Sequence, residues 1–381
     1  MNVPLYDLSP AFGVAAVGLL LALVPYLWFR RRHSGAGPVS RLRALTLLTL
    51  FLSFDLVLLG AYTRLSDSGL GCPDWPGCYG QTSPVGARQA ITQAETAMPT
   101  GPVTHEKAWV EMAHRYSATA IGALIAILAA LSIAASRRGA VAVSPWWPMA
   151  TLVWIGVQGA FGALTVTMKL YPAIVTLHLL GGLILLALLA IQSERYEPQP
   201  LPLSPSLRAG LIAVTVLVVV QICLGGWVST NSAVLACKEF PTCQGAWWPE
   251  TDFAGGFVLQ RPLGGDGSGG YLPYQALTAI HMAHRVGAFI VLPALASLAW
   301  RLHAHGRATR SWAFVIAAIV LWQTASGLGN VLLGWPLASA VAHTAGSAAL
   351  VVVLTILLVR SRSGMRRSAP SWPRRAGAAA S

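Results

Sequence analysis

The chain has 381 residues, of which 55% are hydrophobic and only 10% are charged. This composition excludes an ordinary soluble domain and is typical of a polytopic membrane protein. The formal net charge of +13 does not indicate a nucleic-acid partner, because the arginines are divided among alternate loops rather than gathered in one stretch.

Nine apolar segments are long enough to cross about 30 Å of hydrocarbon as helices. In chain order they lie near 11–29, 44–63, 115–135, 147–168, 173–192, 209–229, 280–300, 312–333 and 339–360. The first segment has neither a preceding basic stretch nor an A-x-A cleavage site. We therefore expect it to remain as a membrane helix rather than to be removed as a signal peptide.

The arginines predict an orientation in the lipid bilayer. Eighteen of the 23 arginines follow every second helix, in the segments 30–43, 137–138, 195–208, 301–310 and 360–375. Loops rich in Arg and Lys stay on the cytoplasmic side. We expect a multi-pass protein of a bacterial cytoplasmic membrane, with its N-terminus outside and its C-terminus in the cytoplasm.

The chain repeats itself at an offset of about 165 residues. His178 and His343 are 165 apart, as are Cys72 and Cys237, whereas the two sequences EMAHR (111–115) and HMAHR (281–285) are 170 apart. A nearly constant offset across several landmarks indicates an internal duplication.

The duplication predicts an all-α membrane protein made of two four-helix bundles. An even number of helices in each half gives both halves the same orientation, so the repeats are parallel. The predicted parts are an extra N-terminal transmembrane helix with a basic linker (1–41), an N-terminal bundle (42–195), a C-terminal bundle (196–362) and a basic cytoplasmic tail (363–381).

Four histidines occupy repeated positions within the membrane. His114 and His178 belong to the second and fourth helices of the first half, and His284 and His343 belong to those of the second half. Ionisable residues inside a membrane are costly and are usually functional. Two imidazoles that face the interior of a four-helix bundle can bind haem iron, so we expect one haem in each half. The alternative is that each histidine is a hydrogen-bonded core residue.

Charged residues accompany two of these histidines. Arg115 and Arg285 follow them directly and could pair with haem propionates, or could extend toward the membrane surface. Glu111 lies three residues before His114 and therefore on the same helix face, whereas the second half has His281 at this position. A carboxylate beside a haem can move protons or stabilise positive charge, or it can be a charge favoured at a helix N-terminus.

Four cysteines form two pairs in the predicted outer loops. Cys72 and Cys78 have the same spacing as Cys237 and Cys243. The outer face is oxidising, which favours two structural disulfides. A thiol redox relay and a metal site remain alternatives.

Several of these motifs resemble the haem A synthase family, whose integral-membrane enzymes convert haem O to haem A for terminal oxidases. The similarity covers about residues 42–360. It rests on GAYTRL at 60–65, on SGLGCPDWP at 68–76, and on Glu111 followed by His114 and Arg115. The extra N-terminal helix departs from the usual eight-helix plan of the family.

The resemblance implies a role for each half. The N-terminal half would hold the substrate haem O between His114 and His178, and the C-terminal half would hold a resident haem b between His284 and His343. One porphyrin methyl group would be oxidised stepwise to a formyl group, with Glu111 as the essential acid and haem b passing electrons. Haem O synthase and a membrane electron carrier are the partners implied. A di-haem cytochrome b that only carries electrons is the alternative function.

Overall fold

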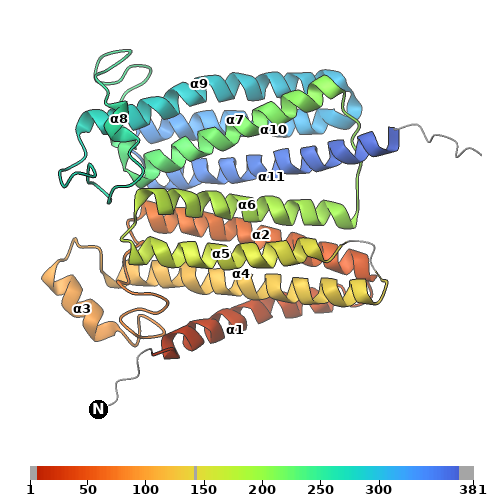
Figure 1. The fold of residues 1–381 in the computed structure, drawn as a ribbon, viewed down its shortest axis with the longest axis horizontal. Coiled ribbons are helices and arrows are strands. Elements are labelled where there is room, and N and C mark those ends of the chain that lie inside the picture. Colours follow the sequence, from red (N-terminus) through yellow and green to blue (C-terminus); the bar gives the residue numbers. More distant parts are fainter. Residues whose placement is uncertain (1–6, 141–143, 369–381) are drawn as a thin grey trace, which may run out of the picture.

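The computed structural model describes residues 7–140 and 144–368, with side chains as far as Arg362. In these residues the fold is all-α, and nine helices are long and apolar enough to cross a membrane (Figure 1). The prediction of a nine-helix membrane protein is therefore confirmed for the described part of the chain. The nine are α1 (Ser9–Arg32), α2 (Pro38–Leu65), α4 (His105–Arg137), α5 (Trp146–Thr167), α6 (Pro172–Tyr196), α7 (Pro205–Thr230), α9 (Tyr274–His305), α10 (Arg307–Leu332) and α11 (Leu337–Ser368).

The long helices run side by side, and their loops gather at two ends (Figure 1). One end carries the Cys loops 66–104 and 231–273, and we call it the cysteine-loop end. It also contains the short elements α3 (Arg88–Ala97), η1 (Ala233–Ala236) and α8 (Phe253–Gly256). The opposite end carries the loop between α1 and α2 and the loops that follow α4, α6 and α9. We call it the arginine-rich end. Most of the predicted basic tail, residues 369–381, lies outside the described residues.

Local sequence explains where several helices begin. Pro38, Pro172 and Pro205 each occupy the first turn of a helix, where the missing N–H costs nothing and the fixed φ favours the helical conformation. Thr104 caps α4, because its hydroxyl accepts a hydrogen bond from the Lys107 N–H. The helices α4 and α6, which carry the first two histidines, thus begin at positions that residues at their own N-termini determine.

The helix contacts divide the long helices into two sets. Helices α2, α4, α5 and α6 pack on one another around a ring, and α7, α9, α10 and α11 do the same. The sets meet along α6, α11, α2 and α7. Figure 1 shows α6 and α11 next to each other in the middle of the molecule. The extra helix α1 packs against α4, on the outer side of the first set.

Helix α1 attaches to α4 through small residues. Gly18 lies against the Thr119 side chain, and Ala22 is buried. Small residues let two membrane helices approach closely, which is the main source of packing energy between helices in lipid. The opposite face of α1 is apolar and exposed, with Phe12, Val24 and Trp28 outward, as expected for a helix that faces acyl chains.

Polar contacts join the two sets at both ends. At the cysteine-loop end, Arg64 of α2 donates to the carbonyl oxygens of Ser229 (2.7 Å) and Thr230 (3.2 Å) in α7. At the arginine-rich end, Arg360 of α11 donates two hydrogen bonds of 2.8 Å to the Glu194 carboxylate of α6. The Glu194 side chain is only 5% exposed, so this pair is shielded from water.

We expect Glu194→Gln to destabilise the protein by roughly 3 kcal/mol, because it leaves the Arg360 guanidinium without its counter-charge in a shielded site. The matched control is Glu197→Gln. Glu197 pairs with Arg43 but is 61% exposed, and an exposed pair contributes about 0–1 kcal/mol. Thermal unfolding of the purified variants in detergent measures both effects. Equal losses in the two variants would contradict the prediction.

Candidate functional site

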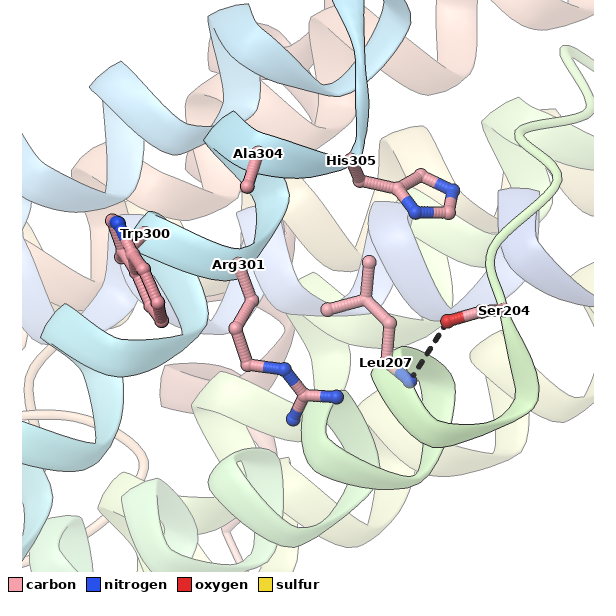
Figure 2. Close-up of a pocket in the computed structure, with 6 residues that line it drawn as sticks. All are labelled: Ser204, Leu207, Trp300, Arg301, Ala304 and His305. Carbon is pink, nitrogen blue, oxygen red and sulfur yellow. Dashed lines mark hydrogen bonds between the residues drawn. The ribbon is translucent and has the colours of Figure 1, made fainter.

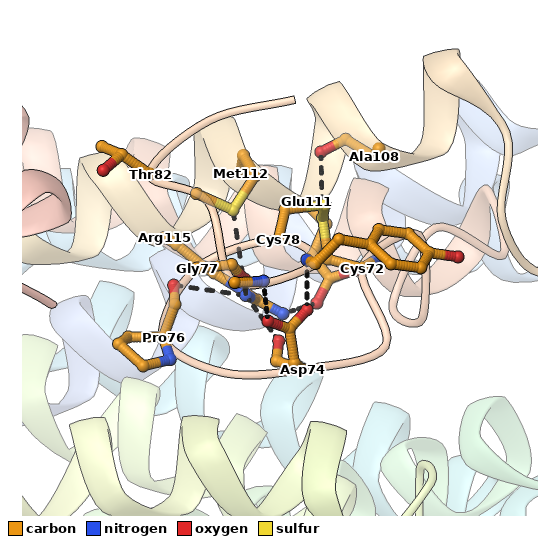
Figure 3. Close-up of a disulfide and its surroundings, with 12 residues drawn as sticks. Cys72, Asp74, Pro76, Gly77, Cys78, Thr82, Ala108, Glu111, Met112 and Arg115 are labelled. Atoms are coloured by element: carbon orange, nitrogen blue, oxygen red, sulfur yellow. Dashed lines mark hydrogen bonds and ion pairs between the residues drawn. A yellow bond between two sulfur atoms is a disulfide. The ribbon is translucent and has the colours of Figure 1, made fainter. Parts of the chain in front are cut away.

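The first Cys loop closes over the start of α4 (Figure 3). Cys72 and Cys78 form a disulfide, and so do Cys237 and Cys243 in the second loop. The predicted pairing within each loop is therefore confirmed. Both Cys pairs are buried in the protein.

Glu111 lies beneath the first loop and is 4% exposed. One of its carboxylate oxygens accepts a hydrogen bond of 2.8 Å from the Cys72 backbone N–H. Its other oxygen forms an ion pair with the Arg115 guanidinium, one helical turn further along α4. Figure 3 shows these contacts as one cluster beside the disulfide. The carboxylate is thus fixed by its own helix on one side and by the loop backbone on the other.

Arg115 also fixes the path of the loop. Its guanidinium donates to the carbonyl oxygens of Asp74 (2.9 Å), Pro76 (3.3 Å) and Gly77. The Asp74 carboxylate in turn accepts hydrogen bonds from two loop N–H groups, those of Tyr79 and Gly80. Arg115 binds both the loop carbonyls and Glu111, so this arginine couples the shape of the loop to the position of the carboxylate.

The second Cys loop uses the same contacts with one difference. Arg285 donates to the carbonyl oxygens of Cys237, Glu239 and Thr242. Where the first half has a carboxylate, Arg285 Nε faces His281 Nε2 at 3.3 Å. Hydrogen bonding, first of all from the Gly245 N–H, lowers the pKa of the Glu239 carboxyl below its usual value.

These contacts bear on the predicted pairing of Arg115 and Arg285 with haem propionates. Both guanidinium groups are buried and bind several loop carbonyls. In this structure both guanidinium groups therefore hold the Cys loops. Their pairing with haem propionates stays a prediction.

The histidines of the first half each lie against a glycine of a neighbouring helix. A Cβ atom at Gly60 of α2 would lie 3.0 Å from His114 Cε1, and one at Gly162 of α5 would lie 3.5 Å from His178 Cε1. The glycines leave room for the rings, and sequence reasoning did not identify them.

The second half repeats this arrangement at an offset of 165 residues. Gly225 of α7 would place a Cβ 3.0 Å from His284 Cε1, and Gly327 of α10 would place one 3.3 Å from His343 Cε1. Gly60 and Gly225 are 165 apart, as are Gly162 and Gly327. A search for glycines that follow the repeat offset would have found this signal.

The spacing of the second pair fits two ligands of one metal ion. The ring centroids of His284 and His343 are 6.5 Å apart, with their planes at 79°. Two metal–imidazole bonds of about 2 Å, each extended by the distance to its ring centre, place two centroids roughly 6 Å apart. A bis-histidine haem iron is therefore compatible with this pair.

The two pairs differ in what contacts their Nδ1 atoms. Ser326 Oγ lies 3.0 Å from His343 Nδ1, and the Gln221 amide lies 3.0 Å from His284 Nδ1. Among the described residues, the Nδ1 atoms of His114 and His178 have no hydrogen-bond partner. In the first half, the residues 165 positions before Gln221 and Ser326 are the apolar Leu56 and Phe161. The ring orientations are therefore more strongly determined in the second half.

Ser326 assigns a tautomer to His343. Its hydroxyl lies 2.7 Å from the Trp322 carbonyl oxygen, to which it donates. The Ser326 oxygen can then only accept from His343, so Nδ1 carries the proton and Nε2 keeps the lone pair that a metal requires.

Comparisons with known proteins agree with this site. The profile of the family COX15-CtaA, cytochrome oxidase assembly protein, matches residues 43–355. A heme A synthase of Shewanella oneidensis is 37% identical over 314 residues, which are 81% of this chain and 93% of that protein. The heme A synthases of Halalkalibacterium halodurans (27% over 337 residues, 84% and 98%) and Caulobacter vibrioides (29% over 332 residues, 81% and 92%) are also similar.

The matched residues begin within α2 and end within α11, so they include both Cys loops, all four histidines and Glu111. Helix α1 lies before them. The resemblance expected from the sequence motifs is thereby confirmed, and the chain belongs to the haem A synthase family of cytochrome oxidase assembly proteins.

Proposed function

We propose that this protein is an oxidoreductase that converts haem O to haem A for a terminal oxidase, by stepwise oxidation of one methyl group to a formyl group. The observation that carries the proposal is that Glu111, which pairs with Arg115, is replaced by His281 at the matching position beside Arg285. Two equivalent electron-carrying haems would need no such difference. Relatives named heme A synthase over most of the chain support the same reaction.

The two helix sets are proposed to be parallel repeats, comprising residues 42–195 and 196–362. In support, the loop contacts of Arg115 recur at Arg285, and each His–Gly contact recurs with its glycine 165 residues later. The second set differs in its polar contacts to Nδ1. We therefore assign the substrate haem O to His114 and His178, where the rings are less constrained, and a resident haem b to His284 and His343.

Glu111 is the proposed catalytic residue. It lies one turn before His114 on the same face of α4, and the Cys72 N–H and Arg115 fix its carboxylate. Each oxidation stage removes hydrogen from the methyl-derived carbon of the substrate. A fixed carboxylate beside that carbon can accept the proton or stabilise positive charge that develops there.

The second half is proposed to hold the electron-transfer group. Bound between His284 and His343, haem b supplies one-electron transfer. The imidazoles of His284 and His343 would hold its iron, Ser326 leaves the Nε2 lone pair of His343 free, and apolar helices surround the pair.

The same proposal implies an orientation in the membrane and two partner proteins. The arginine-rich end would face the cytoplasm of a bacterium, and the cysteine-loop end would face outward. Haem O is insoluble in water, so haem O synthase would deliver it within the membrane, and a membrane electron carrier would exchange electrons with haem b. The alternative of a di-haem cytochrome b predicts two permanent haems and no change in haem mass.

We expect Glu111→Gln to lower haem A formation about 100-fold or more, because the amide keeps the shape of the side chain but neither accepts a proton nor carries charge. Haem O or a hydroxylated intermediate accumulates instead. Mass spectrometry of haem extracted from cells that also express haem O synthase measures the products. Glu106→Gln, on the exposed first turn of α4, is the control. Normal haem A in the Glu111 variant would exclude it as the catalytic residue.

The assignment of the resident haem predicts unequal effects of two histidine substitutions. In protein purified from cells without haem O synthase, His284→Ala should lower bound haem at least about tenfold, because a ligand is lost. His114→Ala should leave it unchanged. Pyridine haemochrome spectra of the purified variants give the haem content per chain. If both variants lose one of two bound haems, the di-haem carrier is favoured instead.

Ser326→Ala should raise the midpoint potential of the resident haem. Without the Nδ1–H···Oγ bond, His343 is a weaker electron donor and stabilises ferric iron less. Thr324→Ala is the matched control, because Thr324 makes the same type of hydrogen bond to a carbonyl one turn earlier but does not contact a histidine. A spectroelectrochemical titration compares the potentials, and an equal shift in both variants would assign Ser326 a purely structural role.

A further inference from the structure

Two shallow grooves adjoin each other at the arginine-rich end of the second helix set. The first, of ≈ 250 Å³, is shown in Figure 2. It is lined by Ser204, Leu207, Trp300, Arg301, Ala304 and His305. The second, of ≈ 230 Å³, shares His305 and continues along residues 306–309 at the start of α10. Both lie far along the helices from the Cys loops and the haem histidines.

The cation in the first groove has no counter-charge. Among the described residues, Arg301 forms no ion pair. The two carboxylates near this end are already engaged, since Glu194 pairs with Arg360 and Glu197 pairs with Arg43. In Figure 2 the Arg301 guanidinium points from α9 toward the first turn of α7, beside Leu207.

A glycine determines where this guanidinium lies. A Cβ atom at Gly210 of α7 would lie only 2.8 Å from Arg301 Nη1. The absence of a side chain at Gly210 thus lets the charge rest against the α7 backbone, near the groove, instead of extending into water.

The helix ends add to the positive potential. Helices α7 and α10 both begin at these grooves, at Pro205 and Arg307. The N-terminus of a helix carries a partial positive charge, which favours anions. At α7 this charge acts without free N–H groups at Pro205 and Leu207, because proline has none and the Ser204 hydroxyl accepts the hydrogen bond from Leu207. Arg301, Arg307 and two helix N-termini therefore face one short stretch of surface.

The remaining lining residues indicate that the anion belongs to a lipid. Trp300 is 70% exposed beside Arg301, and an exposed tryptophan at the end of a membrane helix is typical of the lipid–water interface. Leu207 and Ala304 give the groove an apolar side. A ligand with a phosphate at the interface and acyl chains along the helices matches both chemistries.

We propose that this groove binds the phosphate of an anionic phospholipid, with Arg301 as its principal contact. Basic pockets between membrane helices at this depth bind such head groups. The site is separate from the haem chemistry, so its test does not depend on the proposed function.

The test is native mass spectrometry of the full-length protein, titrated in detergent with phosphatidylglycerol or with phosphatidylcholine. Wild type should bind phosphatidylglycerol preferentially. Arg301→Gln should weaken this binding about fivefold, since one basic residue near the surface contributes about 1 kcal/mol. Gly210→Ala keeps the charge but displaces the guanidinium, and should weaken binding in the same direction.

Arg310→Gln is the matched control, because Arg310 is exposed at the same end but lines neither groove. Binding that survives in Arg310→Gln and falls in both other variants supports the site. Equal losses in Arg301→Gln and Arg310→Gln would show attraction by overall charge and overturn it. Displacement of the lipid by equimolar inorganic phosphate would assign the groove to a free anion and overturn the lipid assignment.

Discussion

Burying a carboxylate within a membrane protein is costly unless the protein supplies its partner, because hydrocarbon supplies none. This constraint governs both ends of the molecule. Glu111 is kept beneath the first Cys loop by the Arg115 guanidinium and a backbone N–H. Glu194 is kept at the opposite end by Arg360, which also joins the two helix sets. The position of each carboxylate is therefore set by a partner that has a second structural task.

The coupling of Arg115 to both the loop and the carboxylate explains why the Cys loops are ordered caps. The disulfide closes a small ring, whose loop-closure entropy contributes modestly to stability. Its larger effect is to present the carbonyl oxygens of Asp74, Pro76 and Gly77 to one guanidinium. In the second loop the same network surrounds Arg285, but His281 replaces the carboxylate. The two halves thus differ at the position that each arginine faces, with a carboxylate in the first half and an imidazole in the second.

A second difference lies deeper in the helices. The rings of His284 and His343 contact polar groups at Nδ1, whereas apolar residues occupy the corresponding positions in the first half. A resident cofactor benefits from rings held in one orientation, and a site that must release its product benefits less from such rigidity. The asymmetry in polar contacts therefore agrees with the division of labour that we propose between the halves.

The sequence by itself determined the nine membrane helices, the repeat offset, the Cys pairs and the residues of the candidate site, because hydropathy, spacing and residue type are local properties. It could not show that Arg115 and Arg285 bind loop carbonyls, since those contacts span about 40 residues. Nor could it show the glycines beside the histidines or the attachment of α1 to α4, which depend on the packing of helices distant in the chain. Only the tertiary structure brings Arg301 against Gly210, because helix-to-helix distances arise from the packing of whole surfaces and leave no periodic signal in either segment.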